Sequence, residues 1–443
     1  MTTSPPHDGA GAPGAAAGEA PSGSSEELAD AGHSPRYVTF VVVISFLAWA
    51  LVSMDNVMLG VAVPALSPAL GLSLSTLEYL VGIFAFVTFA APVIAGRWID
   101  RRGRRWTFQA SLLGTGVFGG LTALIGSTWQ FVLVRLVAAT SFGLTEPVVN
   151  TMVAEEAPRR RRGLLMGLVQ AGYPLGAAVA GTLAALLLPH HGWRPLFLVA
   201  FAPVVIVLVS GRFLRESRSF RAVKAEARRR QIEHRPGWRQ LFTPVQRRQT
   251  VVTSLFGFCI NGGIGLIIGV VTTYLVHVDQ LAIGDAAFLF GLSNWVALAS
   301  QVLVGFLADY LAAKWLMTVY SVLAAGALSL LMVPHLSFSL ALVSLVAFGF
   351  FGNGTFGCYT RYTTESYPAE LRGTGTAFSL GVSFLTLSFM PIIGGALIES
   401  RVPAVIPAVS AALVLLGAAV MACGRNLAPG RELDQLTPSA LLT

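Results

Sequence analysis

Three ionisable residues lie inside long apolar stretches of the sequence. Asp55 and Arg135 belong to two different stretches, and Glu146 follows Arg135 in the second of them. A charged side chain within a membrane span is costly, so such residues are rare and are functional candidates by default. Because no nucleophile–base set accompanies them, the chemistry they suit is ion pairing and reversible proton binding.

Asp55 and Arg135 are predicted to lie at similar depths. Asp55 comes about nine residues before Pro64, the expected outer end of its span, which is roughly 13 Å at the rise of an α-helix. Arg135 lies about five residues below Gln130 at the same face. An aspartate that faces an arginine is held ionised, and protonation releases the pair. The alternatives are a cap on a helix kink for Asp55 and a side chain that reaches the outer surface for Arg135.

Glu146 lies about three helical turns after Arg135, so both project from nearly the same face. A carboxylate deep in this span could bind protons or contact a substrate, and it could equally be hydrogen-bonded between packed helices. Uncharged polar residues at mid-depth share this ambiguity, because buried amides need partners wherever they lie. The candidates for substrate contact are Asn150, Gln170, Tyr173, Asn261, Asn294 and Asn353.

The elements that must position these residues are membrane-spanning helices. The chain of 443 residues is 54% hydrophobic and only 12% charged, unlike soluble domains. Its apolar residues form blocks of about 20, long enough to cross a hydrocarbon core of ~30 Å, and the alternating segments of a β-barrel are absent. We predict an all-α membrane protein of twelve transmembrane helices, at 38–63, 77–96, 106–126, 130–153, 164–188, 195–212, 250–276, 285–308, 314–334, 337–360, 374–398 and 403–424.

The basic residues gather in alternate loops. They cluster at 101–105, 159–162 and 215–248, whereas the opposite loops hold only Arg194 and Arg401. Because basic loops stay on the cytoplasmic side, we predict that both termini are cytoplasmic and that the protein lies in the plasma (inner) membrane. The net charge of +8 is thereby explained by topology and by anionic lipid as a neighbour, without nucleic acid.

Three hydrophilic segments, one at each end and one in the middle, divide the chain into five parts. We predict a disordered cytoplasmic tail at 1–35, a six-helix half at 36–212, a cytoplasmic linker at 213–249, a second six-helix half at 250–424 and a tail at 425–443. The halves are related by a repeat: a shift of about 210 residues aligns Glu155, Arg162 and Asp100 with Glu365, Arg372 and Asp309. Two pseudo-symmetric halves with a substrate bound between them are a recurrent transporter plan.

The loop Gly96–Arg105 fits the pattern G-x-x-x-D-R-x-G-R-R. This loop resembles the signature of the major facilitator superfamily, and the resemblance covers residues 38–424. A second copy at 305–314 keeps the glycine and the aspartate but has lost the arginines. The resemblance implies an inner gate of charge pairs that form in one conformation and break in another, with candidate residues Gly96, Asp100, Arg101, Gly103, Arg104, Glu155, Arg162, Asp309, Arg361, Glu365 and Arg372.

The pairing within this gate can be anticipated in part. We expect Glu155 and Glu156 to pair with the cluster at 159–162, and Arg361 to lie near Glu365. A ligand for a substrate carboxylate is the alternative role for Arg361.

Three further elements resemble the sugar porters and the aromatic-acid and metabolite:proton symporters. They are the two acidic span ends before Pro158 and Pro368, and the segment 215–220, which reads RESRSF. In the proton-coupled sugar porters an acid of the first helix pairs with an arginine of the fourth, and Asp55 and Arg135 match those positions. The resemblance therefore implies that Asp55 and Arg135, with Glu146 as a further candidate, couple transport to protons. The aromatic-acid group carries D-G-x-D in its first helix, and here only the second acid is present.

We expect proton-coupled uptake of a small metabolite, such as an organic acid (aromatic acids included) or a sugar-like solute, by alternating access. A proton-driven exporter of drugs or secondary metabolites is the alternative. The segment 172–176 lacks the Gly-Pro step typical of drug exporters, which favours uptake. Without catalytic or metal-ligand spacing, we expect no enzyme activity, no cofactor and no metal, and a monomer whose partners are the solute, protons and membrane lipid.

Overall fold

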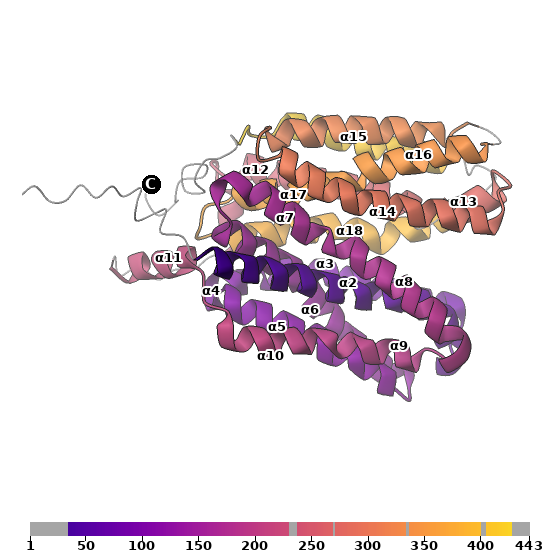
Figure 1. Cartoon of the computed structure of the whole chain (residues 1–443), viewed down its shortest axis with the longest axis horizontal. Helices are drawn as coiled ribbons and strands as arrows, with labels where there is room; N and C mark the ends of the chain where they lie inside the picture. The colour runs from indigo at the N-terminus through magenta and orange to yellow at the C-terminus, as the bar shows by residue number, and fades with distance from the viewer. Residues whose placement is uncertain (1–33, 230–236, 269–270, 334–335, 400–404, 428–443) are drawn as a thin grey trace, which may run out of the picture.

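The computed structural model describes residues 34–229, 237–268, 271–333, 336–399 and 405–427. These residues form helices and short connections, with no β-strand among them. The predicted tails at 1–35 and 425–443 lie almost entirely outside the described residues. Figure 1 shows the helices running side by side, with the first half of the chain on one side of the bundle and the second half on the other.

The first half contains six spans, two of which are interrupted. The fifth span breaks at Ala171 into α7 and α8, and the sixth is broken by a turn of 3₁₀ helix into α9 and α10. The elements are α2 (Pro35–Leu70), α3 (Leu74–Ala95), α4 (Arg97–Arg102), α5 (Arg104–Leu121), α6 (Thr128–Glu156), α7 (Arg162–Gln170), α8 (Gly172–His191), α9 (Arg194–Leu198) and α10 (Ala202–Phe213).

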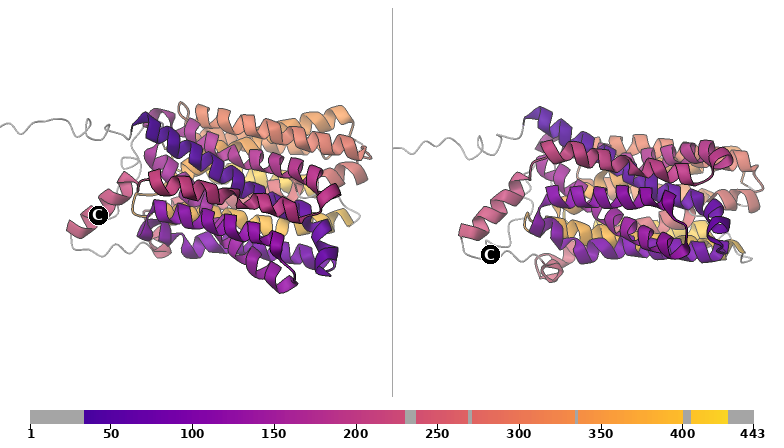
Figure 2. Two further views of the ribbon diagram at one scale, coloured as in Figure 1. Left: turned by 60° about the horizontal axis from the view of Figure 1, so that its bottom comes forward. Right: turned by 90° about the horizontal axis from the view of Figure 1, so that it is seen from below.

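The second half repeats this plan after the helix α11 (Arg218–Arg229), which projects beyond one end of the bundle (Figures 1 and 2). Its fourth span is broken by the 3₁₀ turn η5 (Asn353–Thr355). The elements are α12 (Arg247–Ile268), α13 (Val271–His277), α14 (Ile283–Leu307), α15 (Ala313–Leu330), α16 (Phe338–Phe351), α17 (Phe356–Glu365), α18 (Arg372–Glu399) and α19 (Val405–Ala422).

Ten segments of the described chain are helical, long and apolar enough to cross a membrane. The helices α3 and α5 fill the two remaining places of the repeat. The apolar part of α3 is short, and α5 contains many glycine, serine and threonine residues that lower its apolar character. The predicted twelve-helix membrane fold is therefore confirmed, and the protein is an integral membrane protein.

The two halves meet along two seams that the repeat relates to each other. In one seam α3 packs on α18, and in the other α14 packs on α7. Glycines permit the close approach in both: a Cβ on Gly96 would lie 2.4 Å from the Cβ of Ala377, and one on Gly305 would lie 2.8 Å from the Cα of Gly167. Gly96 and Gly305, which the repeat aligns, therefore occupy equivalent places in the two seams.

The first helix is longer than the sequence predicted. α2 continues through Pro64 to Leu70 and ends at Gly71, whose φ of 64° is the left-handed conformation that suits a helix terminus. Asp55 therefore lies well within the helix, and not near a helix end where it could cap a kink. The predicted span 38–63 agrees with the apolar segment Pro35–Val63 that could cross a membrane, and the helix continues beyond that segment.

Close packing of α2 on α8 gives a test of the fold. A Cβ on Gly176 would lie 2.1 Å from the carbonyl oxygen of Ala50, so Gly176→Val forces the helices apart. Overpacking of this kind costs about 1–3 kcal/mol. We expect a lower midpoint of thermal unfolding for the purified protein in detergent. Gly181→Val on the same helix, where a Cβ meets nothing within 4 Å, is the matched control and should leave the midpoint nearly unchanged. Equal effects of the two substitutions would contradict this account.

Candidate functional site

Asp55 and Arg135 form an ion pair in the interior of the first half. The Nη1 of Arg135 donates a hydrogen bond to Oδ1 of Asp55 at 3.0 Å, and both side chains are almost fully buried. This placement excludes the alternative in which Arg135 reaches the outer surface. Each charge needs the other, because removing one member of a buried pair leaves an uncompensated charge at a cost of about 3–5 kcal/mol.

The surroundings of the pair are apolar and tight. A Cβ on Gly119 of α5 would lie 2.8 Å from Oδ1 of Asp55, so a glycine is needed where the carboxylate rests against that helix. The guanidinium of Arg135 lies 5.8 Å from the ring centre of Phe197, within the range of a cation–π contact. The pair is thus enclosed by a helix backbone on one side and an aromatic ring on the other.

Glu146 lies on α6, buried, and its partner is an amide. Nε2 of Gln170, at the end of α7, donates to Oε1 of Glu146 at 3.0 Å. Among the residues that the structure describes, no lysine, arginine or histidine forms an ion pair with Glu146. Asn150, one turn further along α6, donates from Nδ2 to the backbone carbonyl of Glu146 at 3.0 Å. The structure thus brings together three of the residues that the sequence singled out.

The other predicted substrate contacts are spread over both halves. Asn261 donates to the hydroxyl of Ser383, and Asn294 donates to the backbone of its own helix. The carbonyl of Asn353 accepts a hydrogen bond from Gln301 at 3.2 Å. Tyr173 packs against Trp49, with ring centres 5.7 Å apart. Asn261 and Asn294 are thus engaged within the second half, whereas Tyr173 lies one turn from Gln170.

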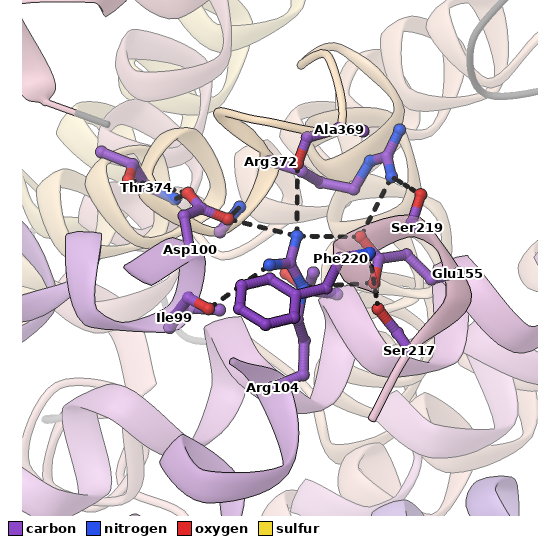
Figure 3. Close-up of polar contacts among 12 residues, drawn as sticks. Ile99, Asp100, Arg104, Glu155, Ser217, Ser219, Phe220, Ala369, Arg372 and Thr374 are labelled. Carbon is purple, nitrogen blue, oxygen red and sulfur yellow. Dashed lines mark hydrogen bonds and ion pairs between the residues drawn. The ribbon is translucent and has the colours of Figure 1, made fainter. Parts of the chain in front are cut away.

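A network of charged side chains joins the halves at one end of the bundle, and Figure 3 shows the part of it around Asp100, Arg104, Glu155 and Arg372. We call this the charged end and define it by eight residues: Asp100, Arg104, Glu155, Arg162, Asp309, Arg361, Glu365 and Arg372. Asp100 of the first half caps α18 of the second. Its carboxylate accepts hydrogen bonds from the backbone N–H groups of Gly373 and Thr374, at 3.1 and 2.6 Å, and from the Thr374 hydroxyl at 2.8 Å. An acid at a helix N-terminus satisfies orphan donors and complements the helix dipole.

Arg104 extends this contact to the end of α6. Its guanidinium lies 3.2 Å from Asp100 and 3.0 Å from Glu155, and it also donates to the carbonyl of Ala369 across the seam. Arg372 of the second half approaches the same Glu155 oxygen, at 3.1 Å. Glu155 is therefore held by one arginine from each half (Figure 3).

The second half makes the equivalent contact to a helix of the first half. Asp309 accepts from the backbone N–H groups of Gly163 and Leu164, at 2.6 and 3.0 Å, and so caps α7 of the first half. Glu365 is bound by Arg162 at 3.1 Å and by Arg361 at 3.0 Å. Each half thus caps a helix of the other with an aspartate and pairs a glutamate with the other's arginine.

The two copies differ in which arginine lies between the aspartate and the glutamate. The decayed copy of the loop motif has no arginine where the first copy has Arg104, and the side chain of Arg361 takes that place. It lies 3.0 Å from both Asp309 and Glu365, as Arg104 lies between Asp100 and Glu155. The predicted neighbourhood of Arg361 and Glu365 is present, and the guanidinium of Arg361 binds the carboxylates of Asp309 and Glu365 and the backbone carbonyl of Ala308.

The predicted partner of Glu155 is wrong. Glu155 binds Arg104 and Arg372, and Arg162 crosses the seam to Glu365 instead of pairing with the adjacent acid. Proximity in sequence favoured the local pair, but the turn at 159–161 directs Arg162 into α7 and toward the other half. Arg101 is exposed and belongs to none of the ion pairs in the described part of the chain.

The charges of the network cancel. Four carboxylates face four guanidinium groups, and all eight side chains are buried or nearly so. Burial raises the pKa of Asp100, although Arg104 and the donors of Thr374 and Gly373 act in the opposite direction. Burial likewise raises the pKa of Asp309. Each carboxylate uses both oxygens for its cap, so a proton on one of them would compete with the hydrogen bonds that the cap receives.

The linker segment 215–220 also enters the network, a contact that the sequence did not specify. Glu216 accepts from the backbone N–H of Arg104 at 2.8 Å and fills the space over Gly103, whose φ is 104°. The hydroxyls of Ser217 and Ser219 contact Glu155 and Arg372 (Figure 3). The RESRSF pattern marked this segment as family-like, but it gave no partner. Among the described residues no cluster of three or more histidine, cysteine or acidic residues could hold a metal ion.

The fold and this network define a class of protein: a helical membrane transporter with two halves, which ion pairs and helix caps hold together at one end. A model of the Major Facilitator Superfamily matches residues 44–378 and 263–437. The chain therefore belongs to that superfamily, and it is a transporter and not an enzyme.

Relatives and solved structures agree. The chain is 26% identical over 394 residues to a gallate transporter of Pseudomonas putida, covering 82% of this chain and 86% of the relative. It is 28% identical over 361 residues to a cis,cis-muconate transport protein of Acinetobacter baylyi, covering 80% and 84%. A structure of the proton:xylose symporter XylE bound to 6-bromo-6-deoxy-D-glucose superposes with a TM-score of 0.76 at 17% identity, covering 91% of this chain and 99% of that one.

Because each half caps a helix of the other, we expect the loss of one cap to weaken the other cap at the charged end. Asp100→Ala removes charge-assisted hydrogen bonds worth about 1.5–3 kcal/mol, so amide exchange at the start of α18 should rise roughly 10- to 100-fold. If the contacts of the charged end separate together, amide exchange should also rise at Gly163 and Leu164, which Asp309 caps. Hydrogen–deuterium exchange of the purified protein measures both. Asp285→Ala, at an exposed acid in the first turn of α14, is the control. A change confined to α18 would show that the two caps act independently.

Proposed function

We propose that this protein is a proton-coupled uptake transporter for a small organic acid, aromatic acids included, that works by alternating access. The observation that carries the proposal is the buried pair of Asp55 and Arg135, which joins α2 to α6 in the interior of the first half. Among the described residues neither Asp55 nor Arg135 forms a second ion pair, so each charge is balanced by the other alone.

The coupling step is an exchange of partners at one carboxylate. When Asp55 is ionised, Arg135 compensates its charge and ties the two helices together. When Asp55 takes up a proton the attraction is lost, and Arg135 becomes a cation in an apolar setting that must find a new partner. The neutral and the ionised pair therefore favour different helix arrangements, which is the requirement for a proton to shift a conformational equilibrium.

The charged end supplies the second requirement, a contact that differs between conformations. In the present conformation the halves are joined there by two exchanged caps and by glutamates shared between the halves. We assign this end to the cytoplasmic side, on the basis of the basic loops around it, so that its closure corresponds to a carrier closed toward the inside. Opening requires all of these contacts to separate together.

The substrate class is supported by the relatives. Proteins named as transporters of gallate, of cis,cis-muconate and of 4-hydroxybenzoate match along about four-fifths of this chain. All three names denote small organic acids. The superposed symporter is a sugar carrier, but its identity of 17% supports the fold alone.

Export driven by protons is the second candidate function. The same fold and the same ion pair would serve it in the reverse direction. Uptake is favoured because the segment 172–176 lacks the Gly-Pro step of the drug exporters and because the named relatives carry metabolites.

The proton-coupling role predicts a separation of two activities. Asp55→Asn cannot be protonated, so accumulation driven by a pH gradient should disappear. Exchange of labelled for unlabelled substrate should persist, because it needs no net proton movement. For one proton per solute the wild type should accumulate up to about tenfold per pH unit. Asp285→Asn, at the exposed acid of α14, is the control. Equal loss of accumulation and exchange in Asp55→Asn would remove Asp55 from the coupling role.

Direction and substrate class are tested in proteoliposomes with an imposed proton gradient. We expect labelled 4-hydroxybenzoate, gallate or cis,cis-muconate to enter vesicles whose outside is acidic, with protein oriented by selective proteolysis or labelling. Accumulation of a drug-like solute against the proton flux, and of none of these acids, would favour the exporter.

A further inference from the structure

Glu146 has no role in the coupling pair or in the charged end, yet it lies between the two halves. Phe142, one turn before it on α6, contacts Phe384 of α18, with ring centres 6.4 Å apart. Residues four apart share a helix face, so Glu146 lies on the face of α6 that is turned toward the second half. Its partner Gln170 ends α7, the helix that packs on α14.

The hydrogen bonds around Glu146 leave acceptors without donors. Gln170 uses its Nε2 on the carboxylate of Glu146, and Asn150 uses its Nδ2 on the backbone carbonyl of Glu146. Because both amide orientations are fixed by these acceptors, Oε1 of Gln170 and Oδ1 of Asn150 are turned elsewhere. Both oxygens are buried without a partner in the described structure. Buried polar atoms normally have partners, so two unpaired oxygens beside one carboxylate indicate a missing donor.

Aromatic rings border this cluster. Trp49 of α2 lies 5.6 Å from Phe142 and 5.7 Å from Tyr173, measured between ring centres. Phe142 is one turn from Glu146, and Tyr173 is one turn from Gln170. The indole N–H of Trp49 is also buried without an acceptor. The surroundings therefore offer flat apolar surfaces, an excess of acceptors and one free donor.

We propose that Glu146, Asn150 and Gln170 form a substrate subsite that binds a hydrogen-bond donor carried on a ring, a hydroxyl or an amino group. The inference rests on the proposed function for its choice of small ring-bearing acids, and it specifies which end of the substrate meets these residues. Among the described residues no cation forms an ion pair with Glu146, so nothing there would bind the carboxylate end of the substrate. A hydroxyl or amino group instead donates to the unpaired acceptor oxygens of Gln170 and Asn150.

The test is equilibrium binding to the purified full-length protein, measured by calorimetry. The probes are 4-hydroxybenzoate, 4-aminobenzoate, 4-methoxybenzoate and benzoate, which differ at one ring position. A site built to hydrogen-bond a donor rejects analogues that lack it, so at least one donor ligand should bind about tenfold or more tightly than the methoxy compound and benzoate. The tighter of the two donor ligands identifies which group the subsite takes.

Glu146→Leu should bring the ratio of affinities close to one. Glu146→Gln, which keeps the size and an acceptor oxygen, should reduce the ratio by several-fold and serves if the leucine variant does not fold. Thr140→Ala is the matched control, because Thr140 lies exposed on the same helix and bonds only to its own backbone. A donor preference that survives both Glu146 substitutions, or no binding of any probe, would overturn the proposal.

The result is separable from that of the transport experiments. Binding at equilibrium needs no proton gradient, so Asp55→Asn should retain the donor preference. If accumulation proves independent of protons while the preference is lost in Glu146→Leu, the subsite stands and the coupling mechanism falls. If Asp55→Asn behaves as expected but Glu146→Leu keeps the preference, the subsite falls and the coupling stands.

Discussion

A carboxylate withdrawn from water must find donors within the protein, and this constraint organises the structure. Asp55 finds an arginine, whereas Asp100 and Asp309 find the free N–H groups of helix ends in the opposite half. The helix ends that bind Asp100 and Asp309 belong to α18 and α7, which form the two seams with α3 and α14. The packing of the halves and the satisfaction of their buried charges are thus one arrangement, and a movement that disturbs the first must disturb the second.

The repeat gives this arrangement its symmetry. The second copy of the loop motif forms the equivalent contacts although it contains only part of the motif. The second copy of the loop has lost the arginine that corresponds to Arg104, yet Arg361 on a different helix supplies a guanidinium to the equivalent pair of acids. What is retained is the balance of charge and the cap. In both copies the residue that bridges the aspartate and the glutamate is an arginine, although the two arginines belong to helices that the repeat does not relate.

Much of the fold followed from the sequence, because a lipid environment permits few solutions. Apolar blocks and basic loops predicted the helices and their orientation, and the loop motif at Gly96–Arg105 predicted the family. The similar depths of Asp55 and Arg135, together with the resemblance to the sugar porters, predicted their pairing. Helix ends and partners were less predictable. The helix α2 continues past the predicted span to Leu70. Glu155 binds Arg372 of the other half and not the adjacent arginines, because side-chain pairing across a seam depends on how two halves pack. The aromatic surroundings of Glu146 had no sequence signal, since they join α2, α6 and α8.

The exchange of caps between halves has a consequence for the architecture as a whole. The contact at the charged end resembles a two-fold interface within a single chain. Each half supplies a capping aspartate to the other half, and the equivalent aspartate of the other half caps a helix in return. Such an interface is self-complementary, so the halves relate to each other as the subunits of a homodimer do. Glu216 and Ser217 of the linker bind Arg104 and Glu155, at only one of the two equivalent contacts. The two contacts are therefore unequal, although the halves that form them are related by the repeat.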